Sequence, residues 1–108
     1  MLQMNEIAQR FSSIRRTIGD AERASEAARD TSAALREQLH KLADEARAAD
    51  TIIGAGQQQR VVEWIDRLED MGDEARRLSR CDDHMSPQLE TAVSKVHAEL
   101  SSLKHQLH

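Results

Sequence analysis

The chain has 108 residues, the size of one domain, and its acidic side chains outnumber the basic ones to give a formal net charge of −4. Aromatic residues make up only 2% of the sequence, and its four glycines and one proline supply too few turn residues for a many-stranded sheet. The apolar runs are too short to cross a bilayer, and the interspersed charges leave no basic stretch for a nucleic-acid backbone. Composition therefore predicts a single all-α domain over residues 1–108, with no membrane span.

The N-terminal residues lack both the basic region and the apolar core of a secretory signal. A single cysteine, Cys81, cannot form an internal disulfide, which agrees with a reducing compartment. Both features predict a cytoplasmic protein.

A heptad pattern of apolar and small residues, alternately four and three apart, occupies the first half of the chain. Its phase survives the polar cluster Asp30-Thr31-Ser32, so the pattern predicts one continuous helix over about residues 3–53. The alternative is a helix split near residue 30, with Asp30 or Ser32 capping a new helix, which would give a four-helix bundle. The pattern consists of Ile7, Phe11, Ile14, Ile18, Ala21, Ser25, Ala28, Ser32, Leu35, Leu39, Leu42, Ala46, Ala49 and Ile53.

Two further helices are predicted after the turn signal Gly54-Ala55-Gly56. The second covers about residues 57–80, and the third covers about 87–107 because Ser86-Pro87 supplies an N-cap and a proline at the first helical position. Their apolar stripes are Val61, Trp64, Leu68, Met71, Ala75 and Leu78, and then Leu89, Val93, Val96, Leu100, Leu103 and Leu107. The predicted architecture is a long helical hairpin with a third helix, a coiled-coil-like bundle.

Helix lengths then predict where a partner binds. At 1.5 Å per residue the first helix would be roughly 75 Å long and the other two about 35 Å each. The second helix would reach back only to about residue 30, unless the third continued past it toward the N-terminus and covered the rest. We therefore predict that four large apolar side chains bind a protein partner, most simply a second copy of the chain in a dimer. They are Ile7, Phe11, Ile14 and Ile18.

The sequence offers no pattern on which to argue catalysis or metal binding. Cys81-Asp82-Asp83-His84 contains possible metal ligands but lacks a second cluster at zinc-site spacing, and we interpret it as a polar loop. His97, His105 and His108 fall outside the last apolar stripe and are predicted to be surface residues. We expect no enzyme activity, no cofactor and no metal. The predicted function is protein–protein interaction, as an adaptor, chaperone, spacer or inhibitor that self-associates.

Two alternative functions rest on particular residues. His40-Lys41-Leu42, followed by Gly54-Ala55 and an amphipathic helix, resembles histidine phosphotransfer domains over about thirty residues. That family has lysine three and glycine four residues after its histidine, whereas this chain has Ala43 and Asp44 there. The second alternative is a nucleic-acid-binding helical dimer that uses two arginine clusters, Arg10, Arg15 and Arg16, and Arg76, Arg77 and Arg80.

Overall fold

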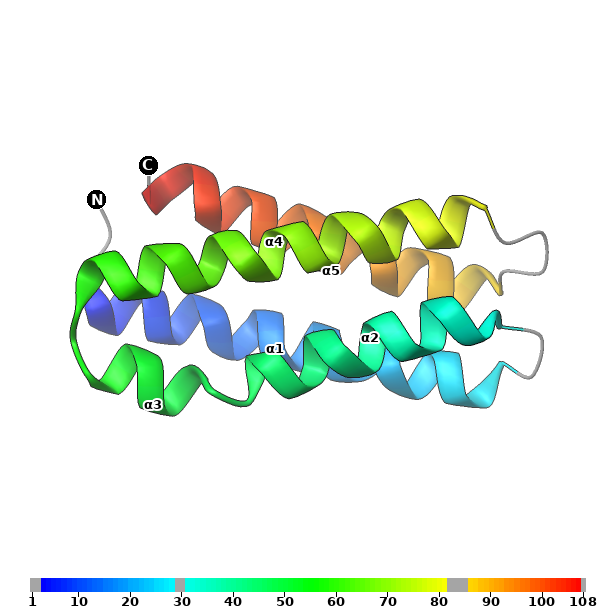
Figure 1. Cartoon of the computed structure of the whole chain (residues 1–108), viewed down its shortest axis with the longest axis horizontal. Coiled ribbons are helices and arrows are strands. Elements are labelled where there is room, and N and C mark those ends of the chain that lie inside the picture. Colours follow the sequence, from blue (N-terminus) through cyan, green and yellow to red (C-terminus); the bar gives the residue numbers. More distant parts are fainter. Residues whose placement is uncertain (1–2, 29–30, 82–85, 108) are drawn as a thin grey trace.

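The structure is a computed structural model that describes residues 3–28, 31–81 and 86–107. These residues form five helices arranged as a four-arm antiparallel bundle of about 41 × 21 × 18 Å (Figure 1). Each arm packs against the next, and the last returns to the first, so the all-α bundle is closed. Of the helices described, none has the length and apolar character that a bilayer span requires. The helices are α1 (Met4–Ala27), α2 (Ala33–Ala46), α3 (Ala49–Gly54), α4 (Gln58–Arg80) and α5 (Pro87–Leu107), with α2 and α3 sharing the second arm.

The continuous helix predicted for residues 3–53 is wrong, and the alternative four-helix bundle is the observed fold. Ala28 leaves the helical region with φ −90° and ψ 99°, and Ser32 is extended with φ −61° and ψ 146°. The Ser32 hydroxyl oxygen accepts a hydrogen bond from the Leu35 N–H at 3.2 Å, which caps α2. The heptad phase survives because α1 and α2 each present a core stripe in the same register, so the phase does not distinguish one helix from two.

A second interruption divides α2 from α3 at Arg47 and Ala48. The Ala48 N–H donates to the Glu45 carbonyl at 3.2 Å, so the turn tightens locally from the α-helical to the 3₁₀ pattern. Both residues keep right-handed helical angles. The arm therefore continues in nearly the same direction, and α3 ends at the glycine turn before α4 (Figure 1).

The helices predicted for residues 57–80 and 87–107 are confirmed, with α5 capped by the Ser86 hydroxyl, which accepts from the Leu89 N–H at 3.1 Å. The core stripe of α4 differs from the prediction because Gly72 and Ser79 are buried, whereas Met71 and Leu78 are only half-buried. A Cβ at position 72 would lie 3.2 Å from the Leu100 Cδ1. Gly72 therefore allows α5 to pack closely against α4.

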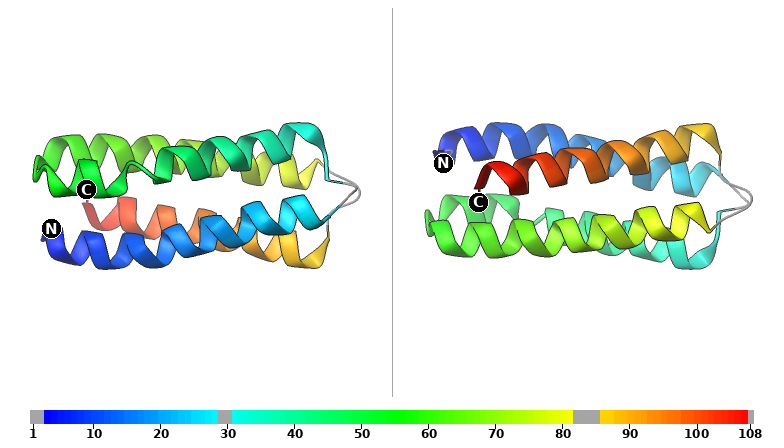
Figure 2. Two further views of the ribbon diagram at one scale, coloured as in Figure 1. Left: turned by 90° about the horizontal axis from the view of Figure 1, so that it is seen from below. Right: turned by 90° about the horizontal axis from the view of Figure 1, so that it is seen from above.

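Both aromatic rings meet in the core. Phe11 of α1 and Trp64 of α4 have ring centroids 4.7 Å apart at a tilt of 52°, and both are about 1% exposed. Since α1 and α4 each pack against α2 and α5, this contact crosses the bundle diagonally. It lies toward the end of the molecule where the two termini meet the α3–α4 turn (Figure 2).

We expect replacement of Phe11 and Ile14 together by aspartate to unfold the chain. Each change removes apolar volume worth about 2–5 kcal/mol and places a carboxylate in the core, and the sum consumes most of the roughly 5–15 kcal/mol that stabilises a domain. Far-UV circular dichroism checks this. The control replaces Ser12 and Arg16, which are exposed on the same helix, by aspartate and should keep its helix content. A helical, monomeric Phe11→Asp/Ile14→Asp variant would contradict the packing.

Two glycine substitutions should differ in effect. Gly19→Ala is expected to stabilise by about 0.5–1 kcal/mol, because alanine is the better helix former and its Cβ would meet only the end of the long Arg23 side chain, 3.4 Å away. Gly72→Ala should stabilise less or destabilise, since its Cβ would press on the fully buried Leu100. Thermal melting of both variants compares their stabilities. A larger increase in stability for Gly72→Ala than for Gly19→Ala would refute the close α4–α5 packing.

Candidate functional site

The four residues predicted to bind a partner lie in the core of the chain itself. Ile7, Phe11, Ile14 and Ile18 are 0–3% exposed, packed among side chains of the other arms. The expectation of an exposed association surface here is therefore wrong for this fold. That expectation depended on a first helix about 75 Å long. The first helix instead ends at Ala27, and α4 and α5 are of similar length to it.

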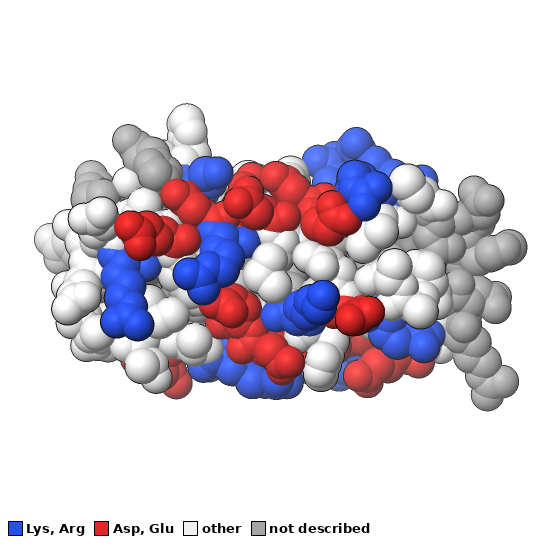
Figure 3. Space-filling model, viewed as in Figure 1, with Lys and Arg blue, Asp and Glu red and all other residues white. Residues whose placement is uncertain are grey.

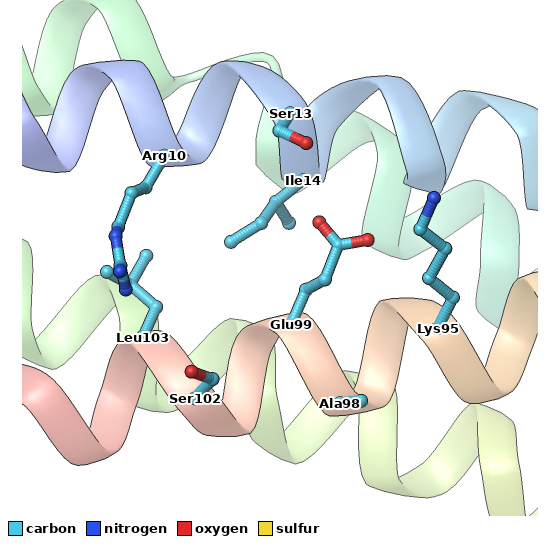
Figure 4. Close-up of a pocket in the computed structure, with 8 residues that line it drawn as sticks. All are labelled: Arg10, Ser13, Ile14, Lys95, Ala98, Glu99, Ser102 and Leu103. Atoms are coloured by element: carbon cyan, nitrogen blue, oxygen red, sulfur yellow. The ribbon is translucent and has the colours of Figure 1, made fainter.

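An open groove between α1 and α5 is the candidate binding site. It encloses about 350 Å³, and Figure 4 shows side chains of both helices lining it. Ile14 and Leu103 form an apolar floor, while Ser13, Ala98 and Ser102 are small enough to leave the space above it open. The full lining is Arg10, Ser13, Ile14, Lys95, Ala98, Glu99, Ser102 and Leu103.

The groove carries a cation at each end. Figure 4 shows Arg10 beside Leu103 at one end and Lys95 at the other, with Glu99 between them. Within the described part of the chain, neither cation forms an ion pair, and Arg10 donates a hydrogen bond to the neutral Gln106 side chain. Glu99 accepts a hydrogen bond from the Thr17 hydroxyl at 2.9 Å. An incoming carboxylate would therefore find an available cation at either end and a fixed negative charge in the middle.

His40, the candidate phosphorylation site, is exposed on α2 but lies between two carboxylates. Its Nδ1 is 2.9 Å from Glu22 Oε2 and its Nε2 is 3.4 Å from Asp44 Oδ2. The hydrogen bond to Glu22 and then the Asp44 charge raise the pKa of His40 above its ordinary 6.5. Phosphotransfer stays a prediction, and both carboxylates would repel a phosphoryl group on either ring nitrogen.

The arginine clusters are dispersed among carboxylates. Arg15 lies 3.2 Å from Asp50, and Arg77 pairs with Glu74, which lowers the pKa of that carboxyl. Arg76 approaches His97. These contacts occupy part of each cluster, and the nucleic-acid alternative stays a prediction.

Of the proposed polar loop, only Cys81 lies in the described part of the chain, and it is exposed. Residues 82–85 and His108 are outside the described residues. His105 is exposed as predicted, whereas His97 is half-buried and pairs with Asp73.

Comparison of the chain with models of protein families, with curated protein sequences and with solved structures gives no significant match. The groove was missed at the sequence level because it requires knowing that α1 and α5 are neighbours. One signal was present: Ala98 and Ser102 are small residues four apart on the outer side of the α5 leucine stripe, where a neighbouring backbone can approach.

The raised pKa of His40 predicts a pH-dependent contribution to stability. Because the folded protein binds this proton more tightly, the contribution is fully present below the unfolded pKa near 6.5 and is lost as pH rises through the higher folded pKa. His40→Gln should therefore cost more stability at pH 5.5 than at pH 9, measured by urea unfolding. Glu22→Gln should return the His40 pKa toward 6.5 in an NMR titration. An equal cost at both pH values would contradict the assignment.

Proposed function

We propose that this protein is a non-enzymatic protein-interaction module whose groove between α1 and α5 receives an acidic amphipathic helix of another protein. One observation supports the proposal: an open groove on the bundle has at each end a cation that forms no ion pair within the described part of the chain. Most large apolar heptad residues of the described chain are already buried against each other, with Ile53, Met71 and Leu78 half-buried, so a partner has to use the outer surface.

The shape of the groove favours a helix as the occupant. Ser13, Ala98 and Ser102 place little bulk in its path, so a partner backbone can approach both helices closely. The floor of Ile14 and Leu103 is almost fully buried already, at 3% and 1% exposure. Binding would therefore bury little further apolar area, and we expect an affinity in the micromolar range. We expect charge pairing to determine the orientation of the partner.

The spacing of the cations defines the partner sequence. Lys95 and Leu103 are eight residues apart on α5, which corresponds to about 12 Å, and Arg10 lies beside Leu103 (Figure 4). A helix laid along the groove would meet both cations with carboxylates seven or eight residues apart. An apolar residue midway would face the floor, and Glu99 would exclude a third carboxylate at that level.

A designed peptide tests the proposal. The probe is a labelled 16-residue helical peptide with glutamates seven residues apart and leucine midway, titrated with the full chain by fluorescence anisotropy. Wild type should bind it, and raising salt from 50 to 300 mM should weaken binding severalfold. Arg10→Glu/Lys95→Glu should lose binding and instead bind the same peptide with lysines in place of the glutamates.

The matched control is Arg16→Glu/Arg60→Glu, which makes the same charge change at exposed arginines outside the groove. It should retain at least half of the wild-type affinity. Equal losses in both double variants would show a general charge effect and contradict the groove. Sedimentation equilibrium tests the competing occupant, since a wild-type dimer that Arg10→Glu/Lys95→Glu dissociates would assign the groove to a second copy of the chain.

A further inference from the structure

A second polar cluster lies between α4 and α5, away from the α1–α5 groove. Glu69 and Asp73 are one turn apart on α4, and His97 of α5 faces them. One donor atom from each residue lies within 4.8 Å of the others. Asp73 is exposed, and Glu69 and His97 are half-buried, so the three donors meet at the surface rather than in the core.

The surroundings of this cluster are acidic. Lys104 Nζ lies 3.3 Å from Glu69 Oε2, and the carboxylates of Asp66 and Asp70 also lie near that lysine. Figure 3 shows acidic side chains gathered over the middle of α4. The carboxylates of Glu69, Asp73, Asp66 and Asp70 outnumber the two cations near them, which are Lys104 and Arg76. The cluster therefore has more acidic than basic side chains.

We infer that Glu69, Asp73 and His97 form a site for a divalent transition-metal ion of the Zn²⁺ class. An imidazole nitrogen with two carboxylate oxygens is a donor set that zinc accepts, with water in the remaining position. Calcium and magnesium favour oxygen-only sets and more ligands. A hollow of about 270 Å³ lies beside Glu69 and is bordered by Ser101, Lys104 and His105.

The hydrogen bonds show what the metal has to displace. Arg76, which only donates, faces His97 Nδ1 at 3.4 Å, so Nε2 carries the proton that Asp73 accepts. A metal on Nε2 takes the place of this proton, the ring becomes the Nδ1–H tautomer, and the Arg76 guanidinium has to turn away. Lys104 must likewise release Glu69. Both cations therefore oppose metal binding, and removing either should strengthen it.

The cluster at His40 provides an internal comparison. It has the same residue types, a histidine with Glu22 and Asp44, although His40 is more exposed than His97. Its carboxylates, however, approach opposite ring nitrogens, so the three residues do not converge on one ion. The geometry assigns the metal to His97 and not to His40, although the compositions of the two clusters match.

The test titrates the full, metal-free chain with ZnCl₂ by isothermal calorimetry, and with CoCl₂ while recording visible absorption. We expect one equivalent to bind with micromolar affinity. His97→Ala and Asp73→Asn should each weaken binding at least tenfold, and His40→Ala should leave it within twofold of wild type. Lys104→Met should bind severalfold more tightly. A nonspecific acidic surface would not predict the loss of binding in His97→Ala.

Circular dichroism of each variant verifies its fold. Asp73→Asn, at an exposed position, carries the test if His97→Ala does not fold. The assignment is overturned if folded wild type binds no Zn²⁺ at 100 µM. It is also overturned if binding survives both Asp73→Asn and His97→Ala, or if His40→Ala or Cys81→Ser removes it instead.

Discussion

The antiparallel packing of α2 against α1 is the constraint on which the rest of the structure depends. It folds one heptad pattern back on itself, so that the stripe of α1 is covered by α2 on one side and by the returning α5 on the other. Ile7 and Ile18, which a continuous helix would have exposed, become core residues that are 0–1% exposed. The same packing makes α1 and α5 neighbours and thereby creates the groove between them. Fold and candidate site therefore follow from this one arrangement.

Side-chain size varies along the bundle and fixes how its arms approach each other. Phe11 and Trp64 fill the middle near the termini, and the Trp64 N–H is buried without a hydrogen-bond partner among the described residues. Such a donor costs about 1–3 kcal/mol, which the large apolar area of the indole offsets. Farther along, Gly72 admits Leu100, and the Gln38 amide on α2 donates to the neighbouring Met71 carbonyl at 3.1 Å. Small residues thus set the close approaches, and the aromatic pair sets the diagonal width.

The sequence was sufficient for the helices that have explicit boundary signals. Ser86-Pro87 and Gly54-Ala55-Gly56 marked the limits of α4 and α5, whereas Ser32 capped a helix that the uninterrupted heptad phase concealed. Neither proposed site was predicted from the sequence, because each depends on which helices are neighbours in the bundle. Glu69 and Asp73 are one turn apart in the sequence, but the sequence does not show that α5 packs beside α4 with His97 facing them. His97 was accordingly read as an ordinary surface histidine.

The two edges of α5 differ in charge in a way that bears on specificity. Its edge toward α1 presents Lys95 and the small residues of the groove, while its edge toward α4 carries His97 and Lys104 within an excess of carboxylates. The proposed acidic helix would be attracted to the first edge and repelled from the second, so the two edges of α5 would together favour binding in the groove. Repulsion from the carboxylates of α4 would also disfavour a proposed partner helix that tilted across α5 toward α4. On this proposal the two cations would determine the orientation of the partner along the groove, since the buried floor of Ile14 and Leu103 gives little directional preference.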